Sequence, residues 1–282
     1  MANSKKSVLL DRLIGEGWFS DKNEAVPWVM GRKVLVNDRP VASVMEKVRP
    51  DDVIRVKEHY KTRYVGKGGL KLEGAIRDFC LDVQGVVALD CGASTGGFTD
   101  CLVAHGASLV YAVDVGFGQL AGKLVQDPKV VNLEKTNLSD ACLLALSPRP
   151  RVITLDLSYL TLKKAVPICL DILHGTGTIV ALIKPLFEVH SPELRRTGAI
   201  DDPQVLREIL ADICAHFDGA GMAILGLTHS PVTGNHNTLE YFIHLGCGVE
   251  AERRLNGNCA QEIDAALERS LQLQKFNKNQ VD

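Results

Sequence analysis

Short apolar segments alternate with longer amphipathic ones over most of the chain after residue 70. Charged residues, Gly or Pro bound the apolar segments, as is typical of buried strands. We predict seven strands, at Val86–Asp90, Leu109–Asp114, Val130–Leu133, Val152–Leu155, Ile179–Ile183, Ala223–Leu227 and Tyr241–Leu245. Strands that alternate with helices form right-handed βαβ crossovers and a mostly parallel sheet. The pattern therefore predicts an α/β, doubly wound Rossmann-type domain over residues 70–246.

The first sixty residues follow a different pattern. Apolar positions predict a helix from Val8 to Glu16 and a second helix that begins after Ser20 and ends at Gly31. Short strands are expected at Val34–Val36, Pro40–Val41 and Val53–Val56. We therefore predict a small α+β domain at residues 1–60. Residues 61–69 are polar and rich in glycine, which is typical of a linker.

The C-terminal tail, residues 247–282, has a helical pattern from about Cys259 to Phe276. The residues Ile263, Ala266, Leu267 and Leu271 share one face of this helix. That face either packs back on the large domain or serves a partner.

A glycine-rich loop follows the first strand of the large domain and precedes a helix. Because glycine has no side chain, the backbone of this loop can approach a ligand closely. We assign to a cofactor site the residues Asp90, Gly92, Ala93, Ser94, Thr95, Gly96 and Gly97. Asp114 ends the next strand, where a carboxylate can accept hydrogen bonds from ribose hydroxyls. NAD, S-adenosylmethionine and a plain strand-to-helix turn all fit this pattern, but the lack of a separate substrate domain favours S-adenosylmethionine.

The net charge of −2 conceals an asymmetry between the two ends of the chain. Residues 1–77 hold 16 Lys and Arg against 10 Asp and Glu, a net charge of +6, which leaves −8 for the rest. A basic N-terminal part fits a polyanionic partner such as RNA, although a solvated basic face gives the same count. No apolar run approaches the roughly 18 residues that span a bilayer, and the N-terminus lacks a signal-peptide pattern. We therefore expect a cytoplasmic protein without a membrane partner.

The cysteines and histidines show no spacing typical of a metal site. Eight cysteines are scattered without a CxxC pair, so we expect free, buried thiols. Cys91, beside the glycine loop, is expected to be a small buried residue rather than a nucleophile. Eight histidines lack ligand spacing, and no metal is expected.

Six motifs occur in one order along the chain. They are Tyr64-Val-Gly-Lys-Gly-Gly-Leu-Lys71-Leu72, Leu89-Asp-Cys-Gly-Ala-Ser-Thr-Gly-Gly-Phe-Thr99, Ala112-Val-Asp114-Val-Gly-Phe-Gly-Gln-Leu120, Asp156-Leu-Ser-Tyr159, Lys184-Pro-Leu-Phe-Glu188 and Glu240-Tyr-Phe242. Together they resemble the TlyA, or hemolysin A-like, family, which joins an S4 RNA-binding domain to an FtsJ-like methyltransferase domain. The resemblance extends to about residue 246, and the segment Gly31–Asn37 resembles part of an S4 domain.

The resemblance implies S-adenosylmethionine as the cofactor and ribose 2′-O-methylation of ribosomal RNA, at cytidines, on free RNA or ribosomal subunits. By position it implies a catalytic set of Lys71, Asp156, Lys184 and Glu240. Val115, Asn137 and Asp156 complete the expected cofactor contacts.

A ribose hydroxyl is a poor nucleophile at neutral pH, so its attack needs a base or stabilisation of the developing alkoxide. Lys184 could act as the base when neutral or as the stabiliser when protonated. Asp156 would orient Lys184, and Glu240 would position Lys71 or the ribose.

Three other functions are open to a chain of this kind. A non-catalytic RNA-binding factor disagrees with the intact catalytic set. A membrane-acting cytolysin, which the name hemolysin suggests, would need an amphipathic hairpin or apolar helix, and the sequence shows neither clearly. An NAD-linked oxidoreductase would need the missing substrate domain.

Overall fold

A computed structural model describes residues 6–16, 18–19, 21–56, 63–189, 191–196, 198, 200–234, 237–248 and 259–278. The chain divides into two compact units, residues 1–67 and 68–282. The structure of each unit follows from its own core.

The smaller unit contains two helices and five short strands in its described part. They are β1 (Ser7–Val8), α1 (Leu9–Gly15), α2 (Lys22–Met30), β2 (Val34–Val36), β3 (Arg39–Pro40), β4 (Lys47–Val48) and β5 (Ile54–Val56). The antiparallel sheet has the order β3-β2-β5, and β1 pairs with β4. Asn37 and Asp38 both have positive φ, as a tight hairpin turn between β2 and β3 requires. The two predicted helices are confirmed, and β2, β3 and β5 coincide with or overlap the three predicted strands, whereas β1 and β4 are too short to leave a pattern in the sequence.

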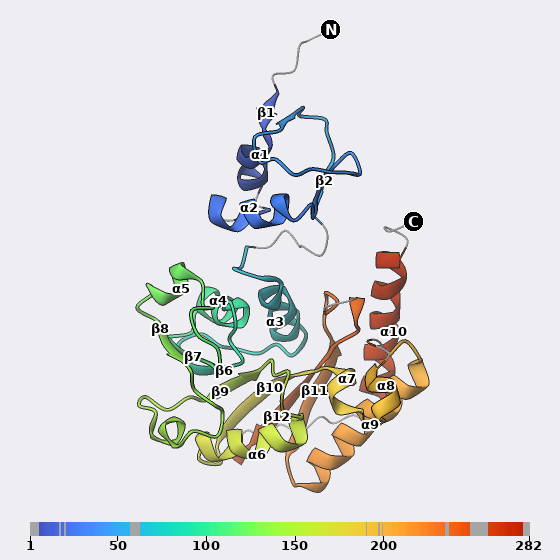
Figure 1. Ribbon diagram of the computed structural model, residues 1–282. Coiled ribbons are helices and arrows are strands. Elements are labelled where there is room, and N and C mark those ends of the chain that lie inside the picture. The colour runs from blue at the N-terminus through green and yellow to red at the C-terminus, as the bar shows by residue number, and fades with distance from the viewer. Residues whose placement is uncertain are drawn as a thin grey trace. The chain divides into compact units, whose positions relative to one another are not determined.

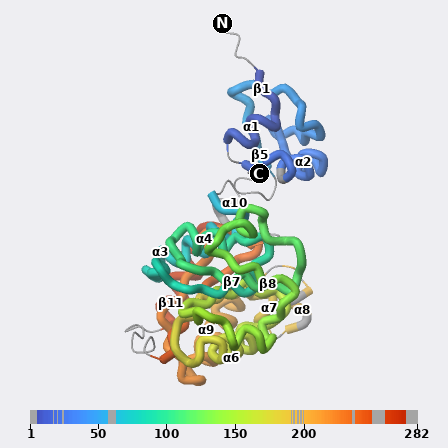
Figure 2. Tube along the Cα trace, turned by 90° about the vertical axis from the view of Figure 1, so that its left-hand side faces the viewer, coloured from blue at the N-terminus to red at the C-terminus, as the bar shows by residue number. Residues whose placement is uncertain are grey.

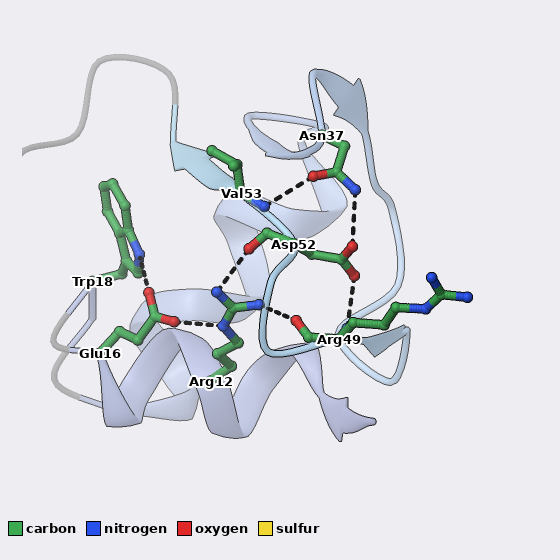
Figure 3. A network of polar contacts seen from close by, with 7 residues as sticks. All are labelled: Arg12, Glu16, Trp18, Asn37, Arg49, Asp52 and Val53. Atoms are coloured by element: carbon green, nitrogen blue, oxygen red, sulfur yellow. Dashed lines mark hydrogen bonds and ion pairs between the residues drawn. The ribbon is translucent and has the colours of Figure 1, made fainter. Parts of the chain in front are cut away.

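Arg12 joins α1 to the loop that leads into β5 (Figure 3). Its Nε donates to Glu16 Oε1 at 2.5 Å, and its terminal nitrogens donate to the carbonyl oxygens of Arg49 and Asp52. The Asp52 carboxylate accepts in turn from Asn37 Nδ2 and from the Arg49 backbone N–H, at 2.9 and 2.7 Å. These bonds lower the pKa of Asp52, the Arg49 backbone bond most strongly. The Arg12 guanidinium, with its three hydrogen-bond acceptors, therefore links α1 to the loop before β5 and stabilises this unit.

The larger unit contains the seven-stranded sheet. Its strands are β6 (Val87–Cys91), β7 (Leu109–Asp114), β8 (Val130–Glu134), β9 (Val152–Leu155), β10 (Gly177–Ile183), β11 (Ala223–His229) and β12 (Tyr241–Cys247). Its described helices are α3 (Lys67–Asp78), α4 (Gly97–Ala104), α5 (Gly122–Val125), the 3-10 helix η1 (Ala141–Ala145), α6 (Leu162–Ile172), α7 (Pro185–Glu188), α8 (Pro192–Arg196), α9 (Pro203–Gly219) and α10 (Cys259–Lys278). All seven predicted strands are present, and the predicted α/β fold is confirmed.

The order of the sheet is β11-β12-β10-β9-β6-β7-β8. The five strands from β10 to β8 are parallel, and β12 runs antiparallel between β10 and β11. Every residue of β9 and β10 is buried, as expected for central parallel strands. Because Ile183 pairs with Tyr241, the register brings the backbones of Lys184 and Glu240 next to each other at the carboxyl edge. The antiparallel pairing of β10 with β12 thus makes Lys184 and Glu240 neighbours, although they are 56 positions apart in the sequence.

Helices cover both faces of the sheet, with α3 and α4 on one face and α6 and α9 on the other (Figures 1 and 2). The main core fills the second face. On the first face Phe98 of α4 contacts Phe242, and Phe79, just after α3, contacts His244. The sheet is therefore buried on both sides, as its apolar strands predict.

Helix α3 packs closely because glycine replaces side chains at its contacts. A Cβ on Gly74 would lie 2.7 Å from the Pro231 ring, and one on Gly97 would lie 2.9 Å from the Gly69 nitrogen. The helix begins at Lys67, so the predicted linker at residues 61–69 overlaps its first turn. Gly68 and Gly69, which were assigned to that linker, lie in the helix and allow it to pack closely against the start of α4.

The tail packs back on the sheet, which settles the alternative that the sequence leaves open. Ile263, Ala266 and Leu267 of α10 are buried in the main core, against β11 and α9. Tyr241 Oη and Ser270 Oγ, both buried, share a hydrogen bond of 2.9 Å. Helix α10 is therefore an integral part of the larger unit.

Candidate active site and cofactor cavity

Lys184 lies directly after β10 and reaches the residues that follow β9. Its Nζ is 2.5 Å from Asp156 Oδ1 and donates a hydrogen bond of 2.9 Å to Ser158 Oγ. The side chains of Lys184 and Asp156 are 16% and 22% exposed, so the pair is shielded but reachable from solvent. The expected orientation of Lys184 by Asp156 is observed, and Ser158 is a second anchor that the sequence analysis missed.

A second ion pair joins α3 to the start of β12. Lys71 Nζ lies 2.5 Å from Glu240 Oε2, and both side chains are almost fully buried, at 7% and 6% exposed. Glu240 was expected to position either Lys71 or the ribose, and in the structure it contacts Lys71. A buried charge without its partner is costly, so each residue holds the other in place.

The glycine loop between β6 and α4 has the backbone conformation that its sequence predicts. Gly92 has a φ of +85°, and a Cβ there would collide with the carbonyl oxygen of Asp156. Gly96 has a φ of +97°, and a Cβ there would collide with the side chain of Leu124. Both positions therefore require glycine, and the loop passes directly beside the strand end that carries Asp156.

Asp114 holds the two loops at the ends of β6 and β7. Its Oδ2 accepts from the Ser94 N–H at 2.8 Å, and its Oδ1 accepts from the Gly116 N–H at 2.7 Å. Ser94 has a positive φ of 49°, which is unusual for a residue with a side chain. Each carboxylate oxygen retains a free lone pair, so Asp114 can also accept from ribose hydroxyls.

A cavity of about 210 Å³ opens at this edge of the sheet. Its lining includes five of the predicted cofactor residues, which are Gly92, Ser94, Asp114, Val115 and Asp156. It also includes residues that the sequence analysis did not assign, which are Cys91, Val113, Gln119, Thr136, Leu138, Leu157, Ser158 and Tyr159. Gln119, Ser158 and Tyr159 lie within the quoted motifs, which could have indicated them. The cavity combines apolar walls with a few polar groups, as small-molecule sites do.

The remaining predicted cofactor residues do not line this cavity. Gly96, Gly97, Ala93 and Thr95 belong to the loop and the start of α4 behind it. Asn137 is exposed, and its Oδ1 accepts from the backbone and the hydroxyl of Ser139.

Asp90 lies beneath the loop and is fully buried. Its carboxylate accepts from Thr99 Oγ1 at 2.7 Å and from Thr154 Oγ1 at 3.0 Å. Burial raises the pKa of Asp90 to about 6, and the nearby negative charge of Asp156 acts in the same direction. Asp90 therefore joins α4 to β9 and lies outside the cavity lining.

The expected inert character of Cys91 agrees with its surroundings. The thiol is buried, and a hydrogen bond with Cys169 together with burial raises its pKa. All eight cysteines are free, although Cys80 and Cys142 are exposed instead of buried. Within the described ranges there is no cluster of three or more potential metal ligands and no helix long and apolar enough to cross a bilayer.

The comparisons with known proteins agree with this geometry. Residues 64–247 match the family of FtsJ-like methyltransferases. Hemolysin A of Brachyspira hyodysenteriae is 36% identical over 230 residues, which cover 81% of this chain and 95% of the relative. The 16S/23S rRNA (cytidine-2′-O)-methyltransferase TlyA of Mycobacterium tuberculosis is 31% identical over 259 residues, which cover 92% of this chain and 95% of the relative.

The solved structure of a protein from Streptococcus thermophilus that is also named a hemolysin aligns with 99% of this chain and with 100% of its own chain. It has a TM-score of 0.73 and 31% sequence identity. The matches confirm a methyltransferase that uses S-adenosylmethionine, and they exclude the NAD-linked alternative. The chain belongs to the TlyA, or hemolysin A-like, group of the FtsJ-like methyltransferases.

Proposed function

We propose that this enzyme methylates the 2′-hydroxyl of a cytidine ribose in ribosomal RNA, with Lys71, Asp156, Lys184 and Glu240 as its catalytic set. The observation that carries the proposal is the position of Lys184 Nζ, 2.5 Å from Asp156 Oδ1, because Asp156 also lines the cofactor cavity. A cation held beside the cavity can act on a hydroxyl that approaches a bound methyl donor. The relative from M. tuberculosis is a 16S/23S rRNA (cytidine-2′-O)-methyltransferase, which supports the choice of ribose and base.

The cavity residues fit the methyl donor. The loop from Gly92 to Ser94 and the carboxylate of Asp114 would hold its ribose and amino-acid parts, and Val113, Leu138 and Leu157 offer apolar surface to its adenine. When bound, S-adenosylmethionine supplies an electrophilic methyl group on a good leaving group.

The four charged residues have two roles: Lys184 and Asp156 act at the acceptor hydroxyl, and Lys71 and Glu240 hold the surrounding elements together. Asp156 holds Lys184 Nζ beside the cavity, where an N–H of Lys184 would donate to the ribose oxygen and stabilise the negative charge that develops on it. As the oxygen attacks the methyl group, its proton would pass to solvent water. Ser158 holds the same ammonium at 2.9 Å and fixes its direction. The Lys71–Glu240 pair is almost fully buried and fixes α3 against the start of β12, next to Lys184 in the sheet register.

The small domain at residues 1–60 is proposed to be an S4-like RNA-binding module. Arg39 and Lys47 are exposed on its strands, and the first 77 residues carry a net charge of +6. Charge reversal at both positions, R39E with K47E, should weaken binding to ribosomal RNA and reduce the slope of its salt dependence, since each phosphate contact releases counterions. Equal affinity and slope would place RNA binding elsewhere. Ribosomal RNA as substrate also favours the cytoplasm as the place of action.

The activity is tested with purified protein, labelled S-adenosylmethionine and ribosomal subunits or ribosomal RNA from cells that lack the gene. The expected product is a labelled nucleotide whose 3′ phosphodiester bond resists alkaline cleavage, because alkaline cleavage needs a free 2′-hydroxyl. Label on a base, which leaves the bond cleavable, would contradict ribose methylation.

A further inference from the structure

A second cavity, of about 340 Å³, opens at the amino edge of the same sheet. Its walls come from the segment after α3, from the first residues of β9 and β10, and from β11 and β12. The cofactor cavity lies at the carboxyl ends of β6, β7 and β9 instead. The two cavities are therefore at opposite ends of the strands and share no lining residue.

A bulge in β11 helps to form this second cavity. Ile224 pairs with Leu245 and Gly226 pairs with His244, so Leu225 has no partner in the register and lines the cavity. Gly226 gives room to the Phe79 ring, since a Cβ there would lie 2.6 Å from it. The bulge and the glycine thus place an aromatic ring on one wall.

His244 is the main polar group of the interior. It is 7% exposed, and its ring lies 5.2 Å from the Phe79 ring with an interplanar angle of 33°. His244 Nε2 is 2.5 Å from Thr178 Oγ1, and the Thr178 hydroxyl donates its one proton to the Leu245 carbonyl oxygen. His244 Nε2 must then carry the hydrogen, which leaves Nδ1 as an acceptor.

Nothing in the described part of the chain bonds to His244 Nδ1. Burial lowers the pKa of His244 to about 4, so the imidazole stays neutral at physiological pH. The interior therefore offers a flat aromatic wall and one hydrogen-bond acceptor.

Two charged residues line the exposed part of the cavity, Arg151 and Asp82. Asp82 Oδ1 accepts a hydrogen bond from the Gln84 N–H at 2.9 Å, and Arg151 is the cation that an anionic group could meet there. No ion pair or side-chain hydrogen bond of its guanidinium occurs with any residue that the structure describes. A free guanidinium matches the geometry of a phosphate.

We propose that this second cavity binds a nucleotide, with the base against Phe79 and His244 and the phosphate at Arg151. An N–H or amino group of the base donates to His244 Nδ1, and the phosphate accepts from the guanidinium. A free nucleotide and a nucleotide within an RNA strand offer the same groups. Binding at this cavity is independent of the methyl transfer reaction.

The experiment is calorimetric titration of the full chain with the four nucleoside 5′-monophosphates, in the presence of saturating S-adenosylhomocysteine. The blocked cofactor site cannot then account for the heat. At least one monophosphate should bind saturably, and R151E should weaken its affinity about tenfold or more. H244F keeps an aromatic ring of similar size and should weaken it as well, while both variants keep wild-type affinity for S-adenosylhomocysteine.

The matched control is R149E, because Arg149 is exposed and close in sequence but does not line the cavity. An effect of R149E equal to that of R151E, or no saturable binding of any monophosphate at millimolar concentration, would overturn the proposal. A single-stranded octanucleotide that binds more tightly than the monophosphates, with the same sensitivity to R151E, would support the site and assign it to RNA. Binding of monophosphates alone would support the site and assign it to free nucleotides.

Discussion

Lys184 Nζ and Asp156 Oδ1 lie 2.5 Å apart, although the two residues follow different strands and are 28 positions apart in the sequence. The parallel pairing of β9 with β10 brings them together at one edge of the sheet. Asp156 also borders the cavity that we propose for the methyl donor, so this contact joins the charged cluster to that cavity.

Lys184→Ala should reduce the rate of methyl transfer by a factor of about 100 to 10,000, because it removes the charge that acts on the ribose oxygen. Affinity for S-adenosylmethionine should stay measurable by calorimetry. Lys163→Ala is a matched control, since Lys163 of α6 also forms an ion pair, with Asp212 of α9 at 2.6 Å. Near wild-type transfer by Lys184→Ala would refute the role given to Lys184.

The Lys71–Glu240 pair should contribute to both stability and catalysis. Lys71→Met leaves Glu240 as an unpaired buried charge and should cost about 3–5 kcal/mol in the free energy of unfolding. The double variant with Lys71→Met and Glu240→Met should recover most of that loss, because it buries two apolar chains, but should stay inactive. Denaturant titration and the methyl transfer assay measure the two effects. An active double variant would show that the pair is purely structural.

The sheet and its seven strands were predictable because each strand is a compact apolar segment with polar flanks. The loop conformation at Gly92 and Gly96 was predictable too, since glycine alone fits the close approach seen there. The strands β1 and β4 were not predictable, because a segment of two residues is too short to show the alternation of apolar and polar positions that is typical of a strand. The tail was undecided because an apolar helix face has the same pattern whether it meets β11 or another molecule.

The site was predictable to a different extent. Motif residues such as Asp156 and Lys184 do lie in contact. Thr136 and Leu138, in contrast, carry no local signal and line the cavity because of the path of the chain after β8. Asp90 was assigned to the cofactor by its place beside the glycines, but the alternation of side chains along β6 points its carboxylate to Thr99 and Thr154.

Asp90 should make stability depend on pH in the weakly acidic range. Its pKa is raised from 3.8 to about 6, so the folded protein binds this proton more tightly than the unfolded chain, and its contribution to stability falls as pH rises through that interval. The difference corresponds to about 3 kcal/mol at neutral pH. Asp90→Asn, which keeps the shape and can bond to both threonines, should therefore be more stable than wild type at pH 7 and equal to it near pH 3.5. A difference in unfolding free energy that does not change with pH would contradict this explanation.

Arg12→Met should destabilise the smaller unit by about 2 kcal/mol, since it removes the bonds from Arg12 to Glu16 and to the carbonyl oxygens of Arg49 and Asp52. Both tryptophans of the chain, Trp18 and Trp28, belong to this unit, so tryptophan fluorescence during denaturation reports on it selectively. Arg39→Met is the control, because Arg39 is exposed on β3. Equal transitions in the two variants would show that the network in Figure 3 adds no stability.

The central claim, ribose methylation of ribosomal RNA, is tested most directly by mapping 2′-O-methyl groups in ribosomal RNA from cells that carry the wild-type gene, the Lys184→Ala variant or no gene. We predict at least one 2′-O-methylcytidine that is present with the wild-type gene and absent in the other two. Identical maps from all three, or a change confined to methylated bases, would contradict the claim.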